Sequence, residues 1–280
     1  MTGSLRLLMV VQSPQIARFV AANGVDRLFI DLETMGKAER QAHMASWKST
    51  QSPQDITRIR EAVPDGHILM RINPLHAGSR AEIDDAIARG ADSIMLPMFR
   101  TTTCLDRFFH LVGDRVQTVP LFETAEAVRL LPAIAGHPLL REAHIGLNDL
   151  HLDLGQRFLF EPIADGTLEE GCAALCEAGV PFGIGGVGRA GEGGLPPENL
   201  LGEHVRLGST CAILSQAFHR NAQSLEDLQK GCDFATEVEA LQQIYRGFRN
   251  AGEQALEENR LQTVAKVRDV VRTIESAARA

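Results

Sequence analysis

Short apolar runs recur along the chain at regular intervals, with amphipathic stretches between them. Most of the runs are apolar on consecutive residues, the pattern of strands that are buried on both faces of a parallel sheet. The predicted strands are LRLLMVV (5–11), RLFIDL (27–32), HILMRI (67–72), SIMLPM (93–98), TVPLFE (118–123), EAHIGL (142–147), PFGIGG (181–186) and HVRLGS (204–209).

The stretches between these runs predict helices. In SRAEIDDAIARG (79–90), two isoleucines and an alanine share one face, and Gly90 ends the helix. TAEAVRLLPAIAG (124–136) follows the same plan, with Pro132 expected to kink or restart the helix. Eight strands that alternate with helices predict an α/β fold, a (β/α)₈ TIM barrel with additional C-terminal helices. A doubly wound open sheet is the alternative, although it usually needs fewer strands.

Two further helical stretches follow the last predicted strand, at about 222–250 and 251–279. We therefore expect a barrel domain over residues 1–221 and a C-terminal helical extension over 222–280. The last stretch carries an apolar stripe from Leu256 to Ile274, and such a stripe left in water would be an aggregation hazard. A neighbouring subunit is the expected cover, so the sequence predicts a dimer-based homo-oligomer, with a hexamer of three stacked dimers as one arrangement.

Composition narrows the classes of partner. The net charge of −8 over 280 residues argues against nucleic acid or an anionic membrane surface as a partner. No apolar run is long enough to span a bilayer, and MTGSLRLLMVVQSP lacks the cleavage pattern of a signal peptide, so we expect a cytoplasmic protein. The five scattered cysteines fit reduced thiols and do not form metal-binding pairs.

Polar residues stand where the predicted strands end, which is where TIM barrels gather their function. Glu123 and Asp149 end consecutive strands and should be neighbours on one rim. Two adjacent carboxylates repel each other unless a cation lies between them, and Mg²⁺ or Mn²⁺ commonly takes one or two carboxylates plus water and substrate oxygens. Arg71 on the same rim would supply a planar fork for a substrate carboxylate. The residues at the strand ends are Asp31, Glu33, Arg71, Asn73, Met98, Arg100, Glu123, Asn148, Asp149 and Arg189, all polar except Met98.

Together these groups predict a site for a 2-oxo acid, where a metal stabilises an enolate during carbon–carbon cleavage or formation. Each residue also has a purely structural interpretation. Asn148 and Asp149 could form a turn and an N-cap, Glu123 could cap the next helix, and Arg71 could pair with Asp31 or Glu33 inside the barrel.

Five segments carry a collinear resemblance over roughly residues 5–220: VDRLFIDLE, MRINPL, GADSIMLPM, PLFETAEAV and IGLNDLHLDLG. They resemble successive motifs of the HpcH/HpaI aldolase and citrate lyase β-subunit family. The resemblance implies a (β/α)₈ barrel that uses Mg²⁺ or a similar ion, with Glu123 and Asp149 as metal ligands. It implies that Arg71 binds the carboxylate of the 2-oxo acid or enolate, and that the backbone at Leu147 and Asn148 contacts the same fragment. In the aldolase branch the C-terminal helices pack across a neighbouring subunit.

The chain departs from the family pattern at several positions. Thr34 stands where the aldolase branch carries a catalytic histidine, and Leu121 stands where that branch favours a glutamine. DLETMGKAER, with Lys37 and Arg40, leans towards the citrate lyase β-like branch, although Met98 replaces the lysine of its Pro-Lys pair. The motif therefore assigns no general base. The candidates are Glu33, which we name with Arg71 as catalytic, and His151, His76 and His43.

The glycine-rich stretch GIGGVGRAGEGG (183–194) favours a flexible lid or turn. If it binds an anion, Arg189 and Ser209, in LGSTC at the start of the last barrel helix, would recognise the distal end of the substrate or a CoA phosphate. The sequence as a whole predicts a divalent-metal-dependent carbon–carbon lyase, an aldolase acting on a 2-oxo acid. The alternatives are a citrate lyase-like acyl-CoA lyase or condensing enzyme, and a non-catalytic barrel that binds metal and ligand as a subunit or sensor.

Overall fold

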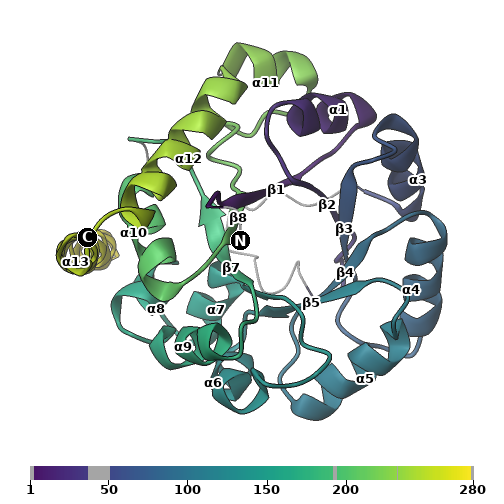
Figure 1. Cartoon of the computed structure of the whole chain (residues 1–280), viewed down its shortest axis with the longest axis horizontal. Helices are drawn as coiled ribbons and strands as arrows, with labels where there is room; N and C mark the ends of the chain where they lie inside the picture. Colours follow the sequence, from purple (N-terminus) through teal and green to yellow (C-terminus); the bar gives the residue numbers. More distant parts are fainter. Residues whose placement is uncertain (1–2, 37–50, 192–193, 232, 279–280) are drawn as a thin grey trace.

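The computed structural model describes residues 3–36, 51–191, 194–231 and 233–278. Within these residues, eight parallel strands form a closed barrel in chain order, and each strand pairs with its sequence neighbours (Figure 1). The ring closes between the first and last strands, where Arg6 is in register with Cys211. The TIM-barrel prediction is confirmed. The strands are β1 (Arg6–Val10), β2 (Arg27–Asp31), β3 (His67–Arg71), β4 (Ser93–Leu96), β5 (Gln117–Phe122), β6 (Ala143–Ile145), β7 (Phe182–Val187) and β8 (Cys211–Leu214).

The first seven predicted strands lie within about one to three residues of the observed ones, but the eighth prediction was wrong. HVRLGS (204–209) forms the last turn of helix α10 (Pro197–Leu207) and the connection that follows it. Gly208 ends this helix in the left-handed conformation, with φ of 84°. The true strand is the four-residue run CAIL at Cys211–Leu214, so LGSTC leads into β8 and does not open a helix.

Helices surround the barrel as an outer ring (Figure 1). Ser13, Thr101 and Thr124 each begin a helix by accepting a hydrogen bond from a backbone N–H of the first turn. Pro132 lies inside its helix, which continues to Ile134 without restarting. The helices that the structure describes before β8, besides α10, are α1 (Pro14–Ala22), α3 (Pro53–Ala62), α4 (Ser79–Ala88), α5 (Thr102–Val112), α6 (Ala125–Ile134), α7 (Leu147–Asp153), α8 (Glu161–Ala164) and α9 (Glu169–Glu177).

In the part of the chain described after β8 there are three helices: α11 (Leu225–Gly231), α12 (Phe234–Arg249) and α13 (Glu253–Ala277). α11 and α12 complete the ring between α10 and α1, whereas α13 lies outside it against α10 and α8 (Figure 1). Asn259 on α13 donates hydrogen bonds to the Asn199 carbonyl and the Glu203 carboxylate of α10. Val267 of the predicted apolar stripe is buried against the chain itself, but Leu261 is 55% exposed.

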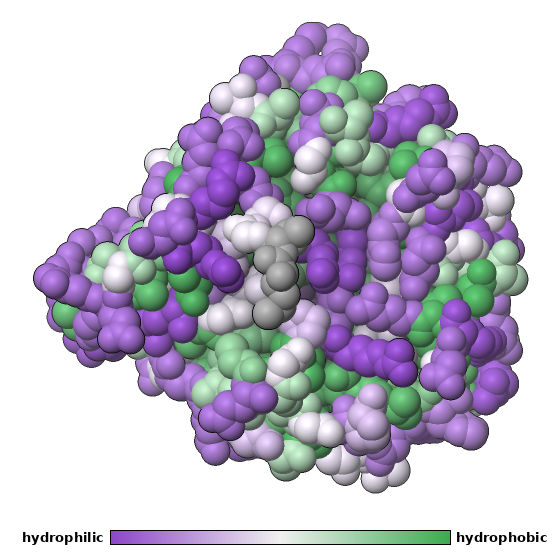
Figure 2. All heavy atoms as spheres, viewed as in Figure 1, coloured by the Kyte–Doolittle hydropathy of each residue, from purple (hydrophilic) through white to green (hydrophobic). Residues whose placement is uncertain are grey.

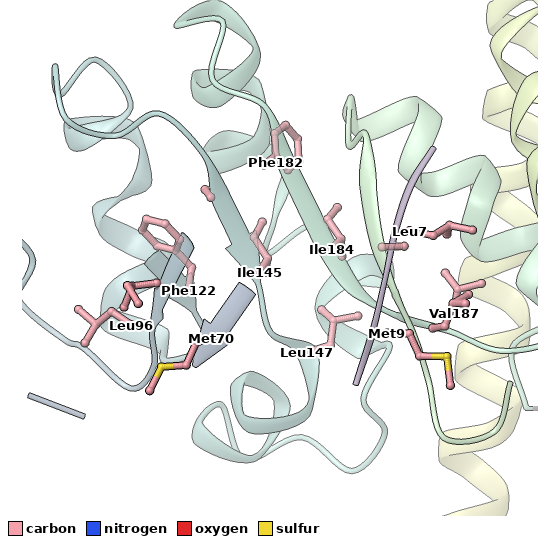
Figure 3. Packing of buried hydrophobic residues seen from close by; sticks show 14 of the residues in the cluster. Leu7, Met9, Met70, Leu96, Phe122, Ile145, Leu147, Phe182, Ile184 and Val187 are labelled. Carbon is pink, nitrogen blue, oxygen red and sulfur yellow. The ribbon is translucent and has the colours of Figure 1, made fainter. Parts of the chain in front are cut away.

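Two sets of apolar side chains form the core. The outward-facing side chains of the strands pack under the helices (Figure 3). A smaller cluster fills the barrel interior and includes Leu8, Phe29, Leu69, Met95, Val119, Leu121 and Cys211. Beneath it, Glu142 accepts hydrogen bonds from Arg27 and Gln117 at the N-terminal ends of the strands. The interior is thus closed at one end, and room for a ligand remains at the other.

Hydrophilic residues cover most of the molecular face seen in Figure 2, with hydrophobic residues showing mainly between the ring helices. In the described part of the chain, no helix combines the length and the hydropathy of a membrane span.

Candidate active site at the barrel mouth

A cavity of about 590 Å³ lies at the C-terminal ends of the strands. One side of it is lined by charged and polar side chains that the sequence singled out: Asp31, Arg71, Glu123, Asn148 and Asp149. Leu147 lines it as well. Barrel geometry therefore brings together the ends of β2, β3 and β5 and the start of α7.

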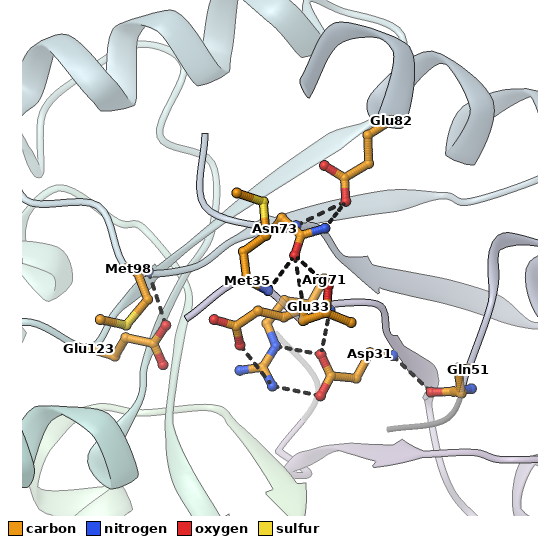
Figure 4. A network of polar contacts seen from close by, with 10 residues as sticks. Asp31, Glu33, Met35, Gln51, Arg71, Asn73, Glu82, Met98 and Glu123 are labelled. Carbon is orange, nitrogen blue, oxygen red and sulfur yellow. Dashed lines mark hydrogen bonds and ion pairs between the residues drawn. The ribbon is translucent and has the colours of Figure 1, made fainter. Parts of the chain in front are cut away.

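Arg71 projects from the end of β3 and forms a two-pronged ion pair with Asp31 on β2 (Figure 4). Its Nε lies 2.9 Å from Asp31 Oδ1, its Nη2 lies 2.8 Å from Asp31 Oδ2, and the same Nη2 lies 3.5 Å from Glu33 Oε2. Burial alone would lower the pKa of Arg71, but the negative charges of Asp31, Glu33 and Glu123 raise it. The ion pair between Arg71 and Asp31, which we considered as a purely structural role for Arg71, does occur. Arg71 lines the cavity as well.

Glu123 follows β5 and is only 2% exposed. Its Oε1 accepts a hydrogen bond from the Met98 N–H. Met98 has a left-handed backbone conformation (φ 55°), which bulky residues rarely adopt. Burial raises the pKa of Glu123 to about 8, Arg71 opposes this shift, and the carboxylates of Asp149 and Glu33 add to it. The next helix begins with Thr124 as its N-cap, so the interpretation of Glu123 as a helix cap was wrong.

Asp149 lies in the first turn of α7 and is 6% exposed. The N-cap of this helix is Gly146, so Asn148 and Asp149 are helical residues and do not form the cap that we considered. A Cβ atom on Gly146 would stand 2.9 Å from Glu123 Cβ and 3.0 Å from Glu123 Oε2. Glycine at this position therefore lets the start of α7 approach the Glu123 carboxylate closely.

The donor set at Glu123 and Asp149 fits a hard divalent cation. Both are carboxylates, both line the cavity, and the repulsion between them contributes to the raised pKa of Glu123. Among the described residues, no group of three or more His, Cys, Asp or Glu side chains is arranged to hold a metal. A cation here would thus use two protein carboxylates and fill its remaining positions with water or substrate oxygens, as Mg²⁺ commonly does.

Two of the histidines named from the sequence, His151 and His76, do not line the cavity. His151 is buried, with Nδ1 3.1 Å from the Leu147 carbonyl oxygen, and His76 lies 3.2 Å from Glu82. His43, Lys37 and Arg40 lie outside the described residues.

Glu33 is buried beside Arg71 and does not line the cavity either. Next to it, Asn73 holds the connection after β2 in place. The Asn73 side-chain oxygen accepts hydrogen bonds from the Thr34 and Met35 N–H groups, and its amide nitrogen donates to Glu82 (Figure 4).

Sequence reasoning missed other residues of the cavity wall. Among the described histidines, His144 and His219 line it. Burial lowers the pKa of His144 to about 4, and its Nε2 lies 3.3 Å from the Gly185 carbonyl oxygen. The alternation along β6 could have identified His144, because it shares the inward face with Glu142. For His219, in the irregular segment after β8, we find no such signal.

The two residues that were predicted to bind an anion near the glycine-rich stretch lie in different parts of the barrel. Arg189 lines the cavity, whereas Ser209 does not. Ser209 precedes β8, at the closed end of the barrel, and its hydroxyl lies 2.9 Å from His204 Nδ1. The placement of Ser209 at the mouth was therefore wrong, because it followed from the misplaced eighth strand. Much of the glycine-rich stretch itself is strand β7.

Several solved structures share this fold. A HpcH/HpaI aldolase from Desulfitobacterium hafniense is 18% identical over 76% of this chain and 86% of its own, with a TM-score of 0.56. A HpcH/HpaI aldolase/citrate lyase family protein from Burkholderia cenocepacia is 17% identical, covering 81% and 94% of the two chains, with a TM-score of 0.59. Macrophomate synthase is 14% identical over 76% and 78%, with a TM-score of 0.55. No family model and no curated protein matches the chain.

Proposed function

We propose that this protein is a divalent-metal-dependent carbon–carbon lyase of the aldolase type that acts on a 2-oxo acid. The observation that carries the proposal is the pair of buried carboxylates, Glu123 and Asp149, that line one cavity together with Arg71. The fold shared with HpcH/HpaI aldolases supports it. Mg²⁺ or Mn²⁺ bound there would polarise the keto group and stabilise negative charge on its oxygen.

The chain's own residues would hold and orient the substrate. Glu123 and Asp149 would hold the cation, and Arg71 would face the substrate carboxylate. The N–H groups of Leu147 and Asn148 open α7, where backbone N–H groups have no partner within the helix, so they can donate to substrate oxygens. Glu33 contacts Arg71 and not the cavity, so we propose that it positions the guanidinium.

Hydrogen exchange at C3 of pyruvate tests this proposal without any second substrate. In deuterated water, NMR should show metal-dependent exchange by the purified protein and its loss with excess chelator. Glu123→Gln and Asp149→Asn should each abolish the exchange and Mn²⁺ binding, whereas Glu33→Gln should slow the exchange and leave Mn²⁺ binding intact.

Glu126→Gln is the matched control, because Glu126 lies in the first turn of α6 as an exposed carboxylate that pairs with Arg100. It should exchange like the wild type. Chelator-resistant exchange, or full exchange by the Glu123 variant, would refute the proposal.

A further inference from the structure

The cavity extends well beyond the charged cluster, along β7 and β8, and has room for a second occupant besides a small 2-oxo acid. Its wall there comes from the start of α7, the segment before α8 and the start of α10. We call these residues the apolar wall: Leu147, Leu159, Phe160, Leu195, Pro197 and Leu200.

The apolar wall is firmly supported from behind. Phe160 packs edge-on against Phe158, with ring centroids 5.3 Å apart. Leu195 and Leu200 belong to the buried core beneath α10. Glycines of β7 form the neighbouring surface, and a Cβ atom on Gly185 would stand 2.6 Å from a Leu147 methyl group. The shape of this half of the cavity is therefore set by packing against the body of the barrel.

Charge is scarce in this half of the cavity. Among the described residues that line this half, Arg189 carries a permanent positive charge, and its guanidinium donates hydrogen bonds to the protein backbone. Its Nε donates to the Phe218 carbonyl at 2.5 Å and its Nη1 to the Gly231 carbonyl at 2.9 Å. Its Nη2 has no hydrogen-bond partner among the described residues but is buried from solvent, so a ligand in the cavity does not contact it. A second carboxylate or a phosphate on the substrate would lose its hydration here without gaining a cationic partner.

We propose that this half of the cavity is the subsite for the electrophile, and that it selects an uncharged aldehyde with an apolar body. The inference rests on the proposed function. In the addition direction, the C3–H bond of the 2-oxo acid breaks and C3 bonds to the aldehyde carbon. The aldehyde oxygen takes up a proton, so no oxidant or reductant is needed. Cleavage is the exact reverse in atoms and electrons.

A matched pair of aldehydes tests the selection. 4-Methylpentanal and 4-oxobutanoate have the same skeleton, with an isopropyl group in one where the other has a carboxylate. With pyruvate and Mg²⁺, kcat/KM should be at least tenfold higher for 4-methylpentanal. Phe160→Ala should reduce this ratio by removing apolar surface. Leu159→Arg should shift it towards 4-oxobutanoate by supplying a cation, while Leu139→Arg, at an exposed position away from the cavity, should leave it unchanged.

Binding without turnover gives a second measurement on the wild-type protein. In saturation-transfer NMR, 4-methylpentan-1-ol should receive magnetisation from the metal-free protein and 4-hydroxybutanoate should not. Equal transfer to both alcohols, or a kcat/KM that favours 4-oxobutanoate, would overturn the inference. If pyruvate exchange persists in that case, only the subsite is wrong. If pyruvate exchange is absent, the proposed function fails, and the two alcohols still report on the subsite.

Discussion

Replacing Gly146 with alanine would place a methyl group against the Glu123 carboxylate. The new carbon would stand 2.9 Å from Glu123 Cβ and 3.0 Å from Glu123 Oε2, well inside the roughly 3.5–4.0 Å of an ordinary contact between carbon atoms. The backbone at Gly146 is extended (φ −93°, ψ 105°), so alanine fits it without strain. The carboxylate must therefore move, by roughly half an ångström or more.

A shift of that size matters for a metal ligand, because Mg²⁺ requires near-ideal geometry at about 2.0–2.1 Å. We expect Gly146→Ala to weaken Mn²⁺ binding at least tenfold, which corresponds to about 1.4 kcal/mol. Overpacking should also lower the free energy of unfolding by about 1–3 kcal/mol. Calorimetric titration with Mn²⁺ and urea denaturation measure the two effects separately.

Gly188→Ala is the control, because its Cβ atom would meet Pro197 and Ala217 only at 3.8 and 4.0 Å, which are ordinary contacts in the same cavity. It should bind Mn²⁺ like the wild type. A Gly146→Ala protein that is destabilised but binds Mn²⁺ normally would refute Glu123 as a ligand. One that matches the wild type in both measurements would refute the steric reasoning itself.

Three further predictions follow from other parts of the molecule. Arg71→Lys keeps the charge but loses the two-pronged contact. A hydrogen bond to a charged group contributes roughly 1.5–3 kcal/mol, so kcat/KM should fall by about 10- to 150-fold. Unchanged kinetics would make Arg71 purely structural. Burial lowers the pKa of His204 from 6.5 to about 3, so only the unfolded chain takes up this proton just below pH 6.5. Stability should fall as the pH drops from 6.5 towards 3, by up to about 1.4 kcal/mol per pH unit, and His204→Gln should flatten that slope in urea titrations at several pH values. Deleting residues 251–280 removes the Asn259 contacts with α10 and should give insoluble or monomeric protein, whereas light scattering of the full chain at micromolar concentration should show an oligomer.

Much of the barrel could be predicted because most of the buried strands are apolar on consecutive residues and several are followed by a polar group. That pattern located β1 to β7, and barrel geometry then brought Arg71, Glu123 and Asp149 to one end. β8 failed because the prediction placed the strand at HVRLGS, at the end of α10, although CAIL is the segment that is apolar on consecutive residues. The pair Pro196–Pro197 and the terminal Gly208 mark the bounds of a helix, and giving them more weight would have corrected the assignment.

Apart from Leu147, the apolar wall could not be predicted, because its residues come from irregular segments and the start of a helix. Phe160 and Leu195 follow no repeat, and only the closed barrel places them on one surface. The choice between substrate contact and internal pairing for Arg71 also stayed open in the sequence. A guanidinium between Asp31 and a cavity can serve both roles, and only coordinates give the distances.

The closure of the barrel between β1 and β8 has a consequence for synthesis on the ribosome. Met9 is in register with Leu214, so the free edge of β1 has no partner until nearly the whole barrel has been translated. At about 5–20 residues per second, this interval lasts roughly ten to forty seconds. An open strand edge is a template for pairing with other chains, and neighbouring nascent chains on one messenger RNA are the nearest of these. A chaperone that shields nascent chains should therefore raise the soluble yield more than one that acts on released protein.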